Sequence, residues 1–260
     1  MEITFVDQPF KDDQYEAGLK ALGKIGYSRV ETKDKRLVSF GREKISAIHK
    51  ASGLGLIQAN TYFDLVHGPE SVEKSLKLNL EMLDFASFFK APFIRVFTGP
   101  LDENAVGTDR ADEETWKLAV KGLKAICRAG AARNVFYPLE THHGTLAENT
   151  ASIFRLLEMV DEPNLCVNLQ IPLKGEADVY ESTRRLAPHV RHTHLNNFDV
   201  SGQSTYLEEG VHDIRREIAV LREHGYDGAL SVEHAYHHPD TLEIAKREFD
   251  FLSGIVRGLS

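Results

Sequence analysis

A single (β/α)8 barrel, or TIM barrel, is the fold that the sequence predicts for residues 1–260. Eight short apolar segments rich in β-forming residues alternate with eight amphipathic helical segments, an alternation typical of parallel strands joined by helices. No G-x-G-x-x-G or G-x-x-x-x-G-K-[ST] loop is present, which disfavours an open doubly wound sheet. The length suits one barrel, and no linker or low-complexity tract marks a second domain.

The expected strands are short and largely apolar, and their β-forming residues give way to polar ones or to turn residues. The fourth is sharply ended by Gly99 and Pro100. The fifth begins at Val135, runs into Glu140, His142 and His143, and is followed by Gly144. The expected ranges are 3–6, 27–32, 54–61, 93–97, 135–144, 165–170, 190–196 and 229–234.

The expected helices carry apolar residues at helical spacing. Gly26 and Gly53 end the first two, Pro69 opens the third, and acidic residues follow Asp112 in the first turn of the fourth. The segment between the seventh strand and the seventh helix is expected to be a loop. The helices are predicted at 12–25, 37–50, 69–89, 112–132, 148–160, 179–186, 211–224 and 239–256.

The composition is that of an ordinary globular protein, with 42% hydrophobic and 27% charged residues. A net charge of −8 argues against general affinity for nucleic acid. The N-terminus lacks the pattern of a signal peptide, and no apolar run is long enough to span a membrane. Cys127 and Cys166 are expected to be buried and reduced. We expect a cytoplasmic protein that binds neither nucleic acid nor membrane, with a homodimer left open.

Four consecutive strands end in side chains that can bind ligands. In a barrel of this kind the carboxyl ends of the strands build the active site. Alternation along a strand places Glu140 and His142 on one face, and likewise His192, His194 and Asn196. With Glu233 on the last strand, two carboxylates, an amide and an imidazole converge, a set suited to Mn²⁺, Mg²⁺, Co²⁺ or Zn²⁺.

Each of these residues also has a structural interpretation. A glutamate at a strand end commonly pairs with a nearby lysine or arginine, and either His192 or His194 is expected to support the other. Arg95 lies inside an apolar strand and needs a carboxylate partner, either Glu31 or a ligand. The remaining histidines are expected at the rim of the mouth: His143, His234, His237 and His238.

The chain resembles the xylose isomerase-like barrels, the sugar isomerase/epimerase superfamily. Five segments carry the resemblance: Ile94-Arg95-Val96-Phe97-Thr98-Gly99, Leu139-Glu140-Thr141-His142, Val167-Asn168-Leu169-Gln170, His192-Thr193-His194-Leu195-Asn196 and Ser231-Val232-Glu233. The resemblance implies a divalent metal ion held by Glu140, Gln170, His194 and Glu233, with Glu140 and Glu233 as the acid/base pair. Local similarity to metal-dependent 3-dehydroshikimate dehydratases implies that His142 and Arg95 contact the substrate.

Two positions depart from the pattern of the family. Gln170 stands where a ligating aspartate is usual, and Asn196 where lysine is frequent. His192 and Asn196 are included among the residues expected to bind a sugar-like substrate. The function expected first is an isomerase or epimerase that acts through an enediolate. A dehydratase, a metal-free sugar-binding protein and, on the acidic balance least of all, a nuclease are the alternatives.

Overall fold

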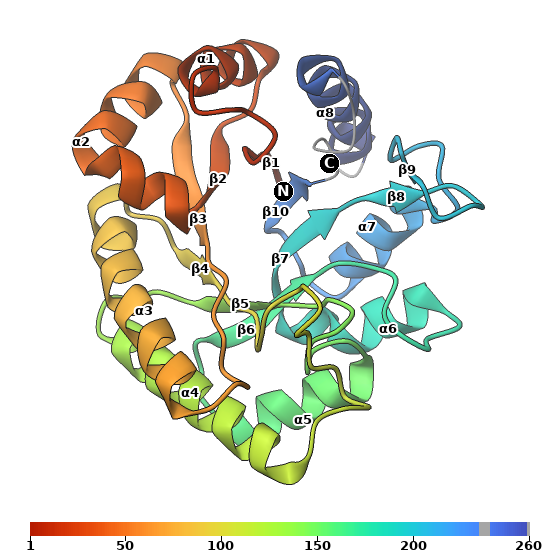
Figure 1. Cartoon of the computed structure of the whole chain (residues 1–260). Helices are drawn as coiled ribbons and strands as arrows, with labels where there is room; N and C mark the ends of the chain where they lie inside the picture. The colour runs from red at the N-terminus through yellow and green to blue at the C-terminus, as the bar shows by residue number, and fades with distance from the viewer. Residues whose placement is uncertain (234–239, 259–260) are drawn as a thin grey trace.

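Eight parallel strands form one sheet that curls around a central axis, and the helices surround it (Figure 1). This computed structural model describes residues 1–233 and 240–258. The order of the strands around the sheet is β4-β3-β2-β1-β10-β7-β6-β5. Their bounds are β1 Glu2–Val6, β2 Arg29–Lys33, β3 Gly55–Asn60, β4 Phe93–Arg95, β5 Tyr137–Glu140, β6 Leu165–Leu169, β7 Val190–Leu195 and β10 Ala229–Val232.

The barrel closes between β4 and β5. Parallel bridges join Phe93 to Phe136 and Val96 to Leu139. The backbone N–H of Ile94 donates to the carbonyl of Phe136 at 3.1 Å, and the N–H of Glu140 donates to the carbonyl of Val96 at the same distance. The predicted (β/α)8 barrel is therefore confirmed, and the carboxyl ends of all eight strands meet at one mouth.

The eight predicted helices are all present, with boundaries that differ by a few residues. Asp112 caps α4 by accepting from the backbone N–H of Thr115, and Asn149 caps α5 through Ser152. The helix α2 begins directly after β2, with a non-helical break at Gly41. The bounds are α1 Tyr15–Ile25, α2 Asp34–Ser52, α3 Pro69–Phe89, α4 Glu113–Ala131, α5 Thr150–Val160, α6 Val179–Leu186, α7 Ile214–Glu223 and α8 Thr241–Gly258.

The segment after β7 contains a small antiparallel hairpin instead of the expected plain loop. Its strands are β8, Asn197–Phe198, and β9, Ser204–Thr205. The buried side chain of Asn197 organises the segment, because its amide donates to the carbonyls of Leu207 and His212, both at 2.8 Å. Strands of two residues carry no periodic pattern, so the sequence did not reveal this hairpin.

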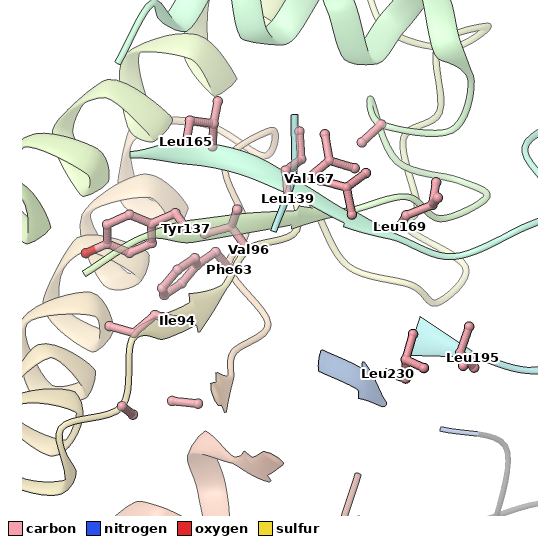
Figure 2. Close-up of a cluster of buried hydrophobic side chains, with 14 of the residues drawn as sticks. Phe63, Ile94, Val96, Tyr137, Leu139, Leu165, Val167, Leu169, Leu195 and Leu230 are labelled. Atoms are coloured by element: carbon pink, nitrogen blue, oxygen red, sulfur yellow. The ribbon is translucent and has the colours of Figure 1, made fainter. Parts of the chain in front are cut away.

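The main apolar core lies between the sheet and the helices, whereas much of the barrel interior is polar. Figure 2 shows part of this core, in which Ile94 of β4, Tyr137 of β5 and Val167 of β6 take part. Inside the barrel, Glu31 and His192 are fully buried. The structure shows no helix among the described residues that is long and apolar enough to cross a membrane.

Glu217 on α7 gives a prediction about stability. Its side chain is fully buried, and neither carboxylate oxygen has a hydrogen-bond partner within the described part of the chain. Burial raises the pKa of Glu217 to about 8. The folded protein therefore keeps this proton while the unfolded chain loses it, and the stability present below the ordinary pKa is lost as the pH rises toward 8.

We expect Glu217→Gln to become progressively more stable than the unaltered protein between pH 5 and 8, by roughly 1.4 kcal/mol per pH unit at most. Denaturant unfolding at several pH values measures the difference. The exposed Glu223→Gln is the control, and a difference for Glu217→Gln that does not change with pH would contradict the assignment.

Candidate active site

Glu140, His194 and Glu233 converge at the mouth of the barrel. Glu140 is the last residue of β5, His194 lies on β7 and Glu233 directly follows β10. The His194 Nδ1 atom lies 3.2 Å from Glu233 Oε1 and 3.4 Å from Glu140 Oε2. One ligand atom from each residue lies within 4.8 Å of the others, and all three residues are buried.

Gln170 joins this group from the end of β6. Its Nε2 donates to Glu233 Oε2 at 2.7 Å, while its Oε1 is buried without a hydrogen-bond partner among the described residues. The orientation of a side-chain amide follows its surroundings, so a cation beside Glu233 would favour the reversed orientation with Oε1 facing the ion. The four residues expected to bind metal are therefore neighbours.

Arg95 pairs with Glu140, and not with Glu31 as the sequence suggested for a structural partner. Arg95 Nη1 lies 2.9 Å from Glu140 Oε2, and both side chains are almost fully buried. Burial alone would raise the pKa of Glu140, but the Arg95 guanidinium and the His194 imidazole lower it to about 2. Glu140 is therefore held as a carboxylate that faces His194.

Glu31 is a residue of the site that the sequence analysis assigned only as a possible partner of Arg95. Its carboxylate lies 2.6 Å from His192 Nε2 and 2.9 Å from His194 Nε2. It also accepts from Gln58 Nε2 at 2.7 Å and from the hydroxyl of Ser231. A charged residue between Val30 and Thr32 in an apolar strand was the available signal, since such a residue must be paired.

The contacts of Glu31 set the ionisation of the centre. Burial raises the pKa of Glu31, but His194 and His192 outweigh it and hold that pKa well below its ordinary value. Burial lowers the pKa of His194, whereas Glu233, Glu31 and Glu140 together raise it well above the ordinary value. Without a metal ion, a protonated His194 therefore balances the surrounding carboxylates.

His192, expected to contact substrate, lies deeper in the barrel than His194. It is fully buried, its ring centre lies 5.6 Å from that of His194, and its Nε2 is bonded to Glu31. This position matches the other expectation, that one of the two histidines supports its neighbour. A direct contact between His192 and substrate stays a prediction.

A small cavity of about 100 Å³ opens beside Gln170. His142 and Asn196 line it together with residues that follow β5, β6 and β7. The His142 ring lies 5.7 Å from the Phe97 ring and nearly perpendicular to it. The buried Oδ1 of Asn196 has no hydrogen-bond partner among the described residues. Both positions therefore suit contact with a small ligand.

The remaining histidines at the mouth divide into two groups. His143 is exposed on the rim of the cavity. His234, His237 and His238, which were also expected at the rim, lie outside the described residues.

The donor set fits a divalent metal ion. It offers one imidazole nitrogen and two carboxylates, and an amide oxygen that is buried and unpartnered lies beside them. Hard oxygen ligands with one imidazole suit Mg²⁺, Mn²⁺, Co²⁺ or Zn²⁺. The second possible cluster, Glu31 with His192 and His194, already has its acceptor oxygens occupied by four donors.

Comparison with curated proteins finds similarity over part of the chain. A 3-dehydroshikimate dehydratase of Bacillus anthracis is 29% identical over 150 residues, 57% of this chain and 51% of that protein. The chain spans about half the length of the curated relatives it matches.

Two solved structures share the whole fold. The structure of a probable 3-DHS dehydratase from Bacillus anthracis matches with a TM-score of 0.82 and 22% identity, over 97% of this chain and 99% of that one. A D-psicose 3-epimerase from Clostridium cellulolyticum H10 matches with a TM-score of 0.79 and 15% identity, over 98% and 99%.

The family model described as "Xylose isomerase-like TIM barrel" matches residues 19–255, a range that includes every element from α2 to α7 and all the residues of the mouth described above. The resemblance seen in the sequence is thereby confirmed, and this chain belongs to the xylose isomerase-like TIM barrel family.

Proposed function

We propose that this protein is a divalent-metal-dependent enzyme that removes a proton beside the carbonyl group of a small hydroxylated ketone. The observation that carries the proposal is the convergence of Glu140, His194 and Glu233 within 4.8 Å at the mouth of the barrel. These residues would hold the ion, with Gln170 as a fourth, neutral ligand. A bound divalent ion would polarise the carbonyl oxygen and stabilise the negative charge that develops on it.

His142 is the residue that we assign as the proton acceptor. Its Nδ1 lies 2.7 Å from the backbone carbonyl of His143, so Nδ1 carries the hydrogen in the neutral ring. Its Nε2 then carries the lone pair that can act as a base. Glu140 is less suited to this role in the structure, since Arg95 already donates to it.

Dehydration is the outcome that we favour. In this reaction the proton passes from carbon to His142 Nε2, the electron pair left on carbon expels the hydroxyl of the next carbon, and His142 returns the same proton to that hydroxyl, which leaves as water. A conjugated double bond remains. The similarity to the dehydratase of Bacillus anthracis and the position of His142 beside the cavity support this outcome.

Epimerisation is the second candidate and was the first expectation from the sequence. Glu140 and Glu233 approach His194 from different strands, so one could take a proton and the other return it on the opposite face. The structural similarity to a D-psicose 3-epimerase favours this candidate. The two outcomes differ in product, because only dehydration releases water and creates a chromophore.

The test is to incubate the protein and Mn²⁺ with 3-dehydroshikimate or with D-tagatose. We expect 3-dehydroshikimate to give a conjugated, absorbing product, and Glu233→Gln to lower kcat at least about 100-fold. The exposed Glu223→Gln is the matched control. An epimer of D-tagatose as the only product would favour the second candidate. No conversion of either compound by protein with stoichiometric metal would contradict the proposal.

Glu31 orients His194 in this proposal. By accepting from Nε2, its carboxylate leaves the Nδ1 lone pair directed toward Glu140 and Glu233, where the ion would bind. We expect Glu31→Gln to weaken Mn²⁺ binding about 10- to 100-fold, measured by titration calorimetry. Glu217→Gln removes another buried carboxylate far from these contacts and should leave the affinity unchanged. Equal affinities for all three proteins would contradict the orienting role.

A change at Gln170 gives a second test, in which metal binding should become tighter. Gln170→Asp adds a negative charge to the ligand set, so we expect tighter Mn²⁺ binding, by about tenfold. Titration calorimetry measures the change, and Gln203→Asp in an exposed loop is the control for a general effect of charge. Unchanged or weaker binding by Gln170→Asp alone would mean that Gln170 does not face the ion.

A further inference from the structure

Three polar residues stand at one level of the mouth, at the ends of neighbouring strands. Lys33 ends β2, Asn60 ends β3 and Arg95 ends β4. The register pairs Lys33 with Asn60 and Asn60 with Arg95. Residues in register on parallel strands share a face, so Lys33 and Arg95 lie on the same side of the sheet with their Cα atoms about 10 Å apart.

This face is the one that lines the barrel interior. Lys33 lies two residues after Glu31, whose carboxylate contacts His194 across the barrel, and side chains two residues apart on a strand share a face. Arg95 on β4 contacts Glu140. Lys33 and Arg95 therefore border the same mouth as the proposed metal ligands.

Lys33 is half-buried and has no ion pair with any residue of the described ranges. Its ammonium lies 5.7 Å from the centre of the Tyr62 ring, and the guanidinium of Arg95 lies 4.6 Å from the same centre. Burial lowers the pKa of Lys33, and so do the neighbouring charges of Arg95, Arg36 and Lys35, opposed by Asp34. A bound anion would offset this concentration of positive charge.

The other charged residues near Lys33 do not neutralise the positive charge of Lys33 and Arg95. Arg36 is already paired with Asp7 and Asp12. The Asp34 carboxylate accepts from the backbone N–H of Lys35, and burial raises its pKa, which weakens it as a counter-charge. With a divalent ion balancing Glu140 and Glu233, the positive charges of Lys33 and Arg95 exceed the negative charge that faces them.

Arg95 retains capacity for a further contact. Its Nη1 donates to Glu140, and its Nη2 donates to the carbonyl of Thr61 at 3.3 Å. Its buried Nε has no hydrogen-bond partner among the described residues. An unpaired donor on a buried cation is costly and is typical of a site that a ligand completes.

We propose that Lys33 and Arg95 form a subsite for a carboxylate group of the substrate, so that the enzyme acts on an anionic hydroxy ketone in preference to a neutral sugar. This inference rests on the proposed function, because it assumes that the reacting end of the substrate lies at Glu140, His194 and Glu233. Lys33 is then the residue that determines specificity, since Arg95 also serves Glu140.

The test is to measure binding of two inert probes to the Mn²⁺ form of the full chain, by titration calorimetry. The probes are 3,4-dihydroxybenzoate and 3,4-dihydroxybenzamide, which share ring and diol and differ in the charged group. We expect the acid to bind at least about tenfold more tightly than the amide. Lys33→Met should abolish this preference without weakening the amide, and Lys33→Arg should largely retain it.

Lys35→Met is the matched control, since it removes an exposed cation two residues away and should leave the preference intact. Thermal melting checks that all variants are folded. Equal binding of the two probes by the unaltered protein, or a preference that survives Lys33→Met, would overturn the inference. Displacement of the acid by inorganic phosphate but not by acetate would assign the subsite to phosphate and overturn it as well.

Turnover separates this inference from the proposed function. A charge preference that depends on Lys33, with no conversion of 3-dehydroshikimate or D-tagatose, would sustain the subsite and contradict the reaction. Conversion of D-tagatose at the same kcat/KM by Lys33→Met and the unaltered protein, without any charge preference in binding, would sustain the reaction and contradict the subsite.

Discussion

The central interaction of this molecule is the buried carboxylate of Glu31, because a charge inside a barrel is stable only where hydrogen-bond donors surround it. The donors come from three other strands: Gln58 from β3, His192 and His194 from β7, and Ser231 from β10. A shift in the register of any of these strands would remove at least one of the four donors. The same bonds fix the ring of His194, so the architecture of the interior and the geometry of the site share one constraint.

The buried guanidinium of Arg95 extends these polar contacts to the other half of the barrel. Arg95 connects β4 to β5 through Glu140, which in turn faces His194. In a (β/α)8 barrel, apolar residues usually fill the interior and polar residues form the site at the rim. Here, polar groups continue from the rim into the interior, and each group limits the orientation of the next.

The fold could be predicted from the sequence because alternation of strands and helices is a local pattern, and Pro69 and Gly26 mark boundaries through backbone chemistry. The ligand positions were accessible for a similar reason, since strand periodicity places Glu140 and His194 on defined faces. The partner of Arg95 was not accessible, because the order of strands in a barrel does not say whether its long side chain reaches along the rim to Glu140 or across the interior to Glu31. The hairpin at Asn197 escaped prediction because it depends on tertiary hydrogen bonds of one side chain.

The ion pair of Arg95 and Glu140 crosses the place where β4 and β5 close the barrel, and this has a thermodynamic consequence. A ligand that needs Glu140 in position can bind only to molecules in which the closure is made, so binding withdraws molecules from the unfolded population by mass action. A ligand present at 100 times its Kd would add about 2.7 kcal/mol to the free energy of unfolding. The melting temperature of the protein therefore reports occupancy of the site, and compounds can be screened as ligands without knowing the reaction.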